Sequence, residues 1–135
     1  MAIISKKNEV SIAVVDDSEL SRKAIIETLD SAGFNVAGEA ESATQAIQIS
    51  HQTPCNIWII DVVMPEISGI ELAKHLSDNK RGVFIIMISS LKMENIIIES
   101  ISSGAIDFLQ KPFEREDLIR SVSKISMQVG KEKDL

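Results

Sequence analysis

The sequence predicts an α/β fold with a doubly wound, five-stranded parallel sheet and five helices. Three observations predict it. Five short apolar runs recur along the chain, stretches of helical length separate them, and aromatic residues make up only 4% of a chain that is 44% hydrophobic. Alternation of strand and helix favours parallel pairing, because a right-handed helical crossover returns the next strand in the same direction.

The apolar runs are the expected strands. They are continuous rather than alternating, which is typical of strands covered on both faces. In chain order they are Ile12–Val15, Phe34–Gly38, Ile57–Ile60, Val83–Ile88 and Ala105–Leu109.

The segments between the runs carry helix signals. Ser42 followed by Gln45 is typical of a capping box at the start of the second helix. Gly33 and Gly104 follow helical patterns and indicate helix ends, and Pro112 closes the fifth strand. The expected domain therefore spans residues 11–128, with an N-terminal extension at 1–10 and a C-terminal tail at 129–135.

Composition excludes several classes of protein. The chain of 135 residues suits one domain, and its net charge of −6 with no basic run argues against nucleic-acid binding. The single cysteine, Cys55, cannot form an internal disulfide. No apolar window approaches the ~20 residues that span a bilayer, and the start MAIISKK is too short an apolar run for a secretory signal. We therefore expect a soluble, cytoplasmic protein without membrane contact.

Acidic residues follow two of the expected strands. Asp16 and Asp17 come after the first, and Asp61 comes after the third. If those strands are neighbours, ~4.8 Å apart, the carboxylates can converge within ~5 Å, where two unit charges repel by about 3 kcal/mol at an effective dielectric near 20. A hard divalent cation relieves this repulsion, and Mg²⁺ accepts one or two carboxylates, a carbonyl and waters. The cluster predicts a metal site with open positions.

A hydroxyl and an ammonium group are expected at the same edge of the sheet. Ser89 follows the fourth strand, and Lys111 follows the fifth. With a metal ion they can surround an oxyanion on Asp61, which supplies the charge neutralisation and positioned donors that phosphoryl transfer needs. Asp61 is the expected nucleophile, because carboxylates can accept phosphoryl groups as acyl phosphates.

Four motifs then occur in order on these strand ends: VVDDSELSR, IWIIDVVMPEISGIEL, IIMISS and SGAIDFLQKPF. Together they make the chain similar to the CheY-like receiver domain of two-component response regulators, over residues 11–128. The resemblance implies a flavodoxin-like, CheY-like fold with strand order 2-1-3-4-5, an order in which the site lies between the first and third strands.

The resemblance also implies a metal-ligand set. Asp61 is the implied phosphoacceptor, Asp17 a direct Mg²⁺ ligand, and Asp16 lies nearby. The backbone carbonyl of Val63 is a further implied ligand, and Mn²⁺ can substitute for Mg²⁺.

Residues of the fourth and fifth strands receive roles from the resemblance as well. Ser89 matches the hydroxyl residue that bonds the phosphoryl group, and Lys111 matches the lysine that pairs with it. The Lys111–Pro112 peptide bond is expected to be cis. Phe108 occupies the aromatic switch position, where many relatives carry tyrosine.

The implied function is a signalling switch that catalyses its own phosphorylation and slow dephosphorylation, rather than an enzyme acting on external substrates. A sensor histidine kinase, a phosphotransfer protein or a small phosphodonor supplies the phosphoryl group. Output is expected through a partner protein at the fourth helix, fifth strand and fifth helix. The expected state is a monomer, with dimerisation after phosphorylation left open.

Other interpretations remain at this point. The chain can be a truncated receiver of a larger regulator, for example of the methylesterase type, or a degenerate receiver that only binds partners. A Mg²⁺-dependent aspartyl phosphatase is disfavoured, because it needs an acid at position 63, which is valine. The acidic residues and Ser89 can be turn or helix caps, and Phe108 can be only a core residue.

Overall fold

The strand order of the sheet matches the expectation. The computed structural model describes residues 10–79, 82–91 and 93–133, so the predicted extension at 1–10 lies, apart from Val10, outside the described residues. Five parallel strands pair in the order β2-β1-β3-β4-β5. The strands are β1 (Ser11–Val15), β2 (Asn35–Ala40), β3 (Ile57–Asp61), β4 (Phe84–Ser89) and β5 (Ala105–Gln110).

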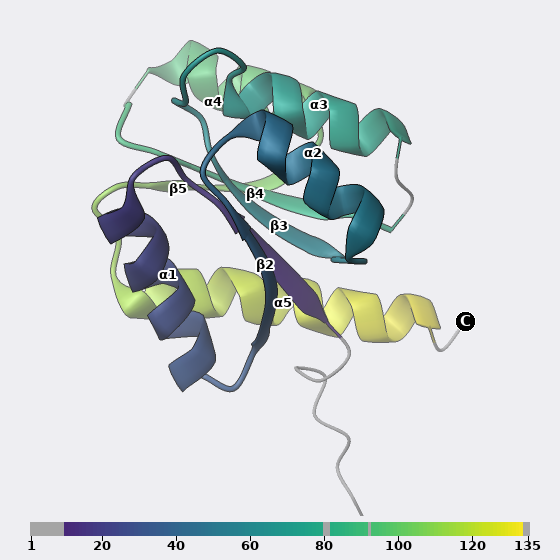
Figure 1. The fold of residues 1–135 in the computed structure, drawn as a ribbon. Coiled ribbons are helices and arrows are strands. Elements are labelled where there is room, and N and C mark those ends of the chain that lie inside the picture. The colour runs from purple at the N-terminus through teal and green to yellow at the C-terminus, as the bar shows by residue number, and fades with distance from the viewer. Residues whose placement is uncertain (1–9, 80–81, 92, 134–135) are drawn as a thin grey trace, which may run out of the picture.

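Five helices cover the two faces of the sheet. They are α1 (Glu19–Ser31), α2 (Ala43–Gln52), α3 (Gly69–Asn79), α4 (Glu94–Ser102) and α5 (Arg115–Lys133). Figure 1 shows α1 and α5 on one face and α2, α3 and α4 on the other. Because successive side chains of a strand point to opposite faces, Ile12 and Val14 pack towards α1 and α5, whereas Ala13 and Val15 pack on the α2 to α4 side.

The edge strands differ from the sequence prediction. Burial on both faces holds for the central strands, in which every residue of β3 is buried. The prediction of burial on both faces is wrong for β2, whose residues alternate between exposed and half-buried up to Ala40. It is also wrong for β5, where Ile106 is 45% exposed. These two strands are the edges of the sheet. β2 also begins and ends later than the predicted Phe34–Gly38, so that Glu39 lies inside it.

Several helix and loop boundaries follow the sequence signals. Ser42 Oγ accepts a hydrogen bond from the Gln45 N–H at 3.1 Å, as a capping box requires. Gln45 Oε1 accepts a hydrogen bond from the Glu41 N–H at 2.7 Å, whereas a capping box would use the Ser42 N–H. Gly33 and Gly104 have φ angles of 90° and 112°, which favour glycine after a helix.

The fifth helix is longer than the sequence suggested. The Lys111–Pro112 peptide bond is cis, as expected. The helix that follows continues to Lys133, whereas the sequence placed its end near residue 128. None of the helices in the described ranges is both long and apolar enough to cross a bilayer.

Burial along β3 gives a stability prediction. Ile59 is fully buried, so Ile59→Ala should lower the free energy of unfolding by about 2–5 kcal/mol, through lost burial and a residual cavity. Ile98 of α4 is 56% exposed, and Ile98→Ala should change it by less than about 0.5 kcal/mol. Urea unfolding of both variants measures the difference. Equal effects would show that β3 is not the packed centre of the sheet.

Candidate functional site

The predicted site residues come together at the carboxyl edge of the sheet. Asp16 directly follows β1, and Lys111 directly follows β5. Asp61 and Ser89 are the last residues of β3 and β4, whereas the sequence placed both just beyond the strands. Their position within the sheet fixes the backbone on which both side chains stand.

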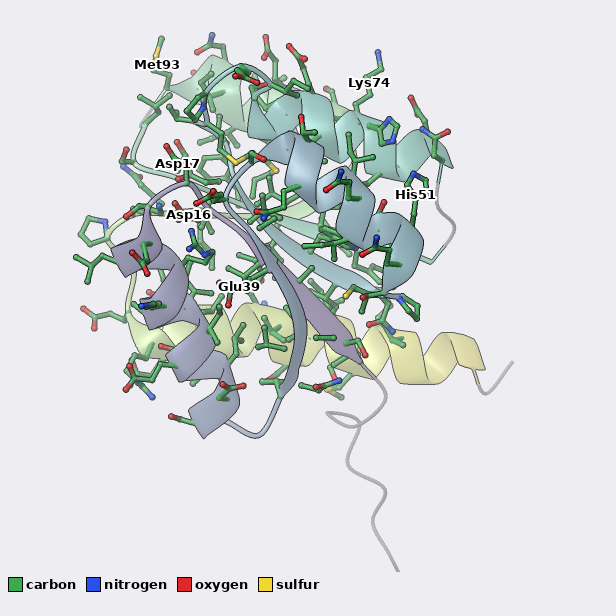
Figure 2. The ribbon with its side chains drawn as sticks, viewed as in Figure 1. Asp16, Asp17, Glu39, His51, Lys74 and Met93 are labelled. Atoms are coloured by element: carbon green, nitrogen blue, oxygen red, sulfur yellow. The ribbon has the colours of Figure 1, made fainter. Side chains whose placement is uncertain are left out.

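Three carboxylates form an acidic cluster at this edge. One carboxylate oxygen from each of Asp16, Asp17 and Asp61 lies within 4.8 Å of the others. Asp16 is fully buried, Asp61 is 7% exposed and Asp17 is exposed. Figure 2 shows Asp16 and Asp17 above the start of α1, with His51 well away from them on α2. This set of hard oxygen donors fits a divalent cation such as Mg²⁺.

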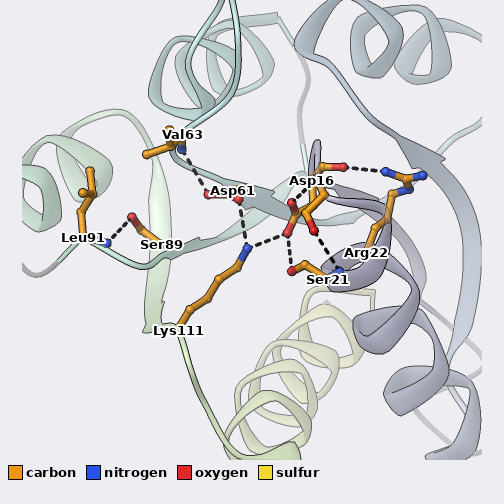
Figure 3. Close-up of polar contacts among 9 residues, drawn as sticks. Asp16, Ser21, Arg22, Asp61, Val63, Ser89, Leu91 and Lys111 are labelled. Carbon is orange, nitrogen blue, oxygen red and sulfur yellow. Dashed lines mark hydrogen bonds and ion pairs between the residues drawn. The ribbon is translucent and has the colours of Figure 1, made fainter.

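The ammonium group of Lys111 bridges two of these carboxylates. Its Nζ donates to Asp16 Oδ2 at 2.8 Å and to Asp61 Oδ2 at 3.0 Å (Figure 3). The backbone N–H of Lys111 also donates to the Ser89 carbonyl at 2.8 Å. This bond continues the pairing of β4 with β5 and holds the lysine beside Ser89.

Asp16 is held from several sides. Its Oδ1 accepts the Ser18 N–H at 2.9 Å, and its Oδ2 accepts the Ser21 hydroxyl at 2.7 Å. Burial alone would raise the pKa of Asp16, but the hydrogen bonds from Lys111, Ser21 and Ser18 outweigh burial and lower this pKa below its usual value.

The pKa values of the other two charged groups, Asp61 and Lys111, are raised. Burial raises the pKa of Asp61; the Lys111 hydrogen bond opposes this shift, and the negative charge of Asp16 adds to it. Burial alone would lower the pKa of Lys111, but its bonds to Asp16 and Asp61 raise that pKa above the usual value. The lysine is therefore protonated at neutral pH, whereas Asp61 ionises less readily than an exposed aspartate.

Ser89 lies beside this network, and its side chain is fully buried. Its Oγ accepts the Leu91 N–H at 3.0 Å and so stabilises the turn that follows β4. It does not cap α4, because that helix begins at Glu94 after Met93.

Val63 and Phe108 complete the predicted set. The Val63 N–H donates to Asp61 Oδ1 at 3.1 Å, and the Val63 side chain is exposed. Phe108 is half-buried and packs against the apolar core on the α2 to α4 side of the sheet. Its role as a switch, and that of the Val63 carbonyl as a ligand, stay predictions.

Two residues that the sequence analysis left without a role also shape the site. A Cβ on Gly69, the first residue of α3, would collide with the Asp61 carbonyl oxygen, so glycine lets α3 approach the end of β3. Arg22 of α1 donates from Nη1 to the Asp16 carbonyl at 2.8 Å and from Nε to Glu39 Oε1 at 3.1 Å. Glu39 of β2 is thus tied to the site.

Known proteins resemble this chain in sequence and in fold. The family whose sequence model matches residues 12–123 is described as "Response regulator receiver domain". Chemotaxis protein CheY of Thermotoga maritima is 30% identical over 115 residues, which cover 85% of this chain and 96% of that protein. The protein-glutamate methylesterase/protein-glutamine glutaminase of Treponema pallidum is 28% identical over 121 residues, 87% of this chain and 30% of that protein.

Solved structures agree on the fold. The CheY-like response regulator receiver domain protein of Methanospirillum hungatei superposes with a TM-score of 0.85 at 22% identity, over 91% of this chain and 98% of that one. At this identity the likeness establishes the fold alone.

The opposite pKa shifts of the two buried aspartates give a prediction for the cation-free protein. At pH 7 Asp16→Asn should lower the free energy of unfolding by about 1–3 kcal/mol, because charge-assisted hydrogen bonds are lost. Asp61→Asn should raise it, because the ionised form of Asp61 is disfavoured in the folded state.

The pH dependence has opposite signs for the two groups. A lowered pKa means that the contribution of Asp16 is present above its unfolded value, near 3.8, and is lost as pH falls through the folded value. A raised pKa means that the penalty from Asp61 appears as pH rises through the folded value. Urea unfolding between pH 3 and 7 in a chelator measures both, and a destabilised Asp61→Asn protein at pH 7 would contradict the assignment.

Proposed function

Because the chain belongs to the response regulator receiver domain family, we propose that it is a phosphorylation-dependent signalling switch with Asp61 as its phosphoacceptor. One observation carries the proposal: the Lys111 ammonium lies between Asp16 and Asp61 beside a cluster of three carboxylates. An exposed or unpaired set of acidic residues would not support it, because phosphoryl transfer needs positioned positive charge next to the nucleophile.

The reaction is a transfer from a phosphorylated histidine, or from a small phosphodonor, to Asp61. A carboxylate oxygen of Asp61 attacks phosphorus, and the bond from phosphorus to the imidazole nitrogen breaks. The nitrogen keeps the electron pair, and an acyl phosphate forms on Asp61. Lys111 and the Ser89 hydroxyl stabilise the negative charge on the transferred oxygens.

Metal binding completes the proposed site. Asp17, Asp61 and the Val63 carbonyl would hold Mg²⁺ or Mn²⁺, with Asp16 nearby. The bound cation supplies charge neutralisation for the phosphoryl oxygens. Within the chain, Asp17 suits the role of direct ligand best, because its carboxylate is exposed and lies within 4.8 Å of Asp61.

The proposed output runs from Ser89 and Phe108 to the surface of α4, β5 and α5. Movement of Ser89 towards the new oxygens would leave space into which the Phe108 ring turns. This face exposes apolar side chains, with Ile98 and Ile101 more than half exposed and Ile106 on the edge strand. Ile96 and Ile97 of the same helix are half-buried, so only part of the isoleucine group is available to an output protein.

The proposed partners are a sensor histidine kinase or phosphotransfer protein and an output protein, in the cytoplasm. A reducing compartment is consistent with the unpaired thiol of Cys55. The alternative of a receiver within a larger regulator is supported by the methylesterase relative, of which the match covers 30%. Valine at position 63 supports self-modification over a phosphatase acting on external substrates, because no second acid stands there.

Phosphorylation can be tested directly. Incubation with Mg²⁺ and acetyl phosphate should add the mass of one phosphoryl group to the intact protein, and Asp61→Asn should abolish the gain, because the nucleophile is lost. Asp30→Asn, at an exposed position of α1, is the matched control and should be phosphorylated like the wild type. An unmodified wild-type protein, or a phosphorylated Asp61→Asn protein, would reject Asp61 as acceptor.

The lifetime of the phosphorylated form is a separate prediction. Val63 and Leu91, which follow Asp61 and Ser89 by two positions, are both apolar and orient water poorly, so the acyl phosphate should be long-lived. Leu91→Glu should shorten its half-life about tenfold or more, because a positioned carboxylate can act as a general base. Mass spectrometry of the isolated phosphoprotein in Mg²⁺ gives both half-lives. A wild-type half-life of seconds would contradict the hypothesis.

A further inference from the structure

We propose that Arg22 is a positioning residue for the metal site, which sets where Asp17 lies and so how tightly Mg²⁺ binds. The inference deepens the proposed function and rests on its metal site. It concerns a residue of α1 whose guanidinium donates to the Asp16 backbone carbonyl (Figure 3). Its second partner is Glu39 of β2, outside the three-carboxylate cluster.

The guanidinium of Arg22 joins three segments of the chain. Nη1 donates to the Asp16 carbonyl at 2.8 Å, and Nε donates to Glu39 Oε1 of β2 at 3.1 Å. The Arg22 side chain is 10% exposed, although that of Glu39 is 55% exposed. A planar guanidinium presents its donors in a rigid fork, which a lysine ammonium on a flexible stem does not.

Asp16 is also held by β2 through its amide. The Asp16 N–H donates to the Ala40 carbonyl at 3.1 Å, so both backbone polar groups of Asp16 have partners. The Asp16 carbonyl belongs to the planar peptide group that leads into Asp17. Arg22 therefore fixes the orientation of the peptide on which the Asp17 side chain stands.

Asp17 needs this support more than Asp16 does. The Asp16 carboxylate accepts bonds from Ser18, Ser21 and Lys111. The Asp17 carboxylate is exposed and makes no side-chain hydrogen bond to any described residue. Its position therefore depends on the backbone, and groups that orient metal ligands typically change metal affinity by about 10–100-fold when they are removed.

Geometry and charge make opposite predictions for Arg22. If the arginine acted through its charge, it would repel a divalent cation from the carboxylates, and its removal would strengthen Mg²⁺ binding. If it acts by orienting the Asp16–Asp17 peptide, its removal weakens binding. The sign of the change in Mg²⁺ affinity therefore separates the two roles.

The experiment is a calorimetric titration of the full chain with Mg²⁺. Arg22→Met should raise the dissociation constant by about 10–100-fold. Arg22→Lys keeps the charge but loses the rigid fork of donors, so it should raise the constant by nearly as much. Glu39→Gln, at a half-exposed side chain, should raise it less. Lys23→Met removes the same charge from an exposed neighbour that pairs with Glu19, and should change it by less than about twofold.

Thermal melts without Mg²⁺ identify the temperature range in which each variant is folded. A purely structural role would lower the melting temperature and leave the dissociation constant unchanged within that range. If Arg22→Met does not fold, Arg22→Lys still separates the two roles, because it keeps the charge and a charge role predicts no change for it. Unchanged or tighter Mg²⁺ binding by these variants would overturn the role of Arg22. No Mg²⁺ binding by the wild-type protein would instead reject the metal site, and with it the inference.

Discussion

The charge network around Lys111 is the interaction on which the rest of the site depends. Asp16 follows β1, and Asp61 ends the neighbouring strand β3. Both are nearly or fully buried, and the lysine donates to one oxygen of each. Two carboxylates ~5 Å apart repel by about 3 kcal/mol at an effective dielectric near 20, so the shared ammonium group offsets a cost that the strand order creates. Loss of Lys111 would leave two buried carboxylates without a compensating charge, which is more harmful than loss of an exposed ion pair.

The central strands could be predicted from the sequence, and the edges of the sheet could not. Long apolar side chains of β3 and β4 indicate burial on both faces. β3 is buried throughout, and β4 is buried apart from the half-buried Phe84. The run at 34–38 was misjudged because Ala37 and Gly38 are small and fit an exposed edge as well as a core. Burial at an edge is set by the order of the strands, which hydrophobicity alone does not encode. For the same reason, the observed ends of β2 differ from the predicted Phe34–Gly38.

Charged residues of the site could be predicted from the sequence, because their residue types and their positions after apolar runs indicate a function. Asp17, Asp61 and Lys111 are charged groups after apolar runs, a pattern that is unusual without a function. Arg22 was missed because its partner is a backbone carbonyl, which carries no sequence signature, and because an arginine on a helix is ordinarily exposed. Ser18 did carry a signal that was overlooked: as N-cap of α1 it accepts the Ser21 N–H at 3.2 Å.

Two consecutive aspartates directly after β1 serve different ends, because one is buried and the other is exposed. Asp16 is buried, and its two carboxylate oxygens accept bonds from backbone and side chains. Asp17 faces solvent, with its oxygens available to a cation. Under the proposed function, a cation that reached Asp17 and Asp61 from solvent would leave the bond from Lys111 to Asp16 in place. Binding of the metal and retention of the lysine would then be compatible, as the proposed phosphoryl transfer to Asp61 would require.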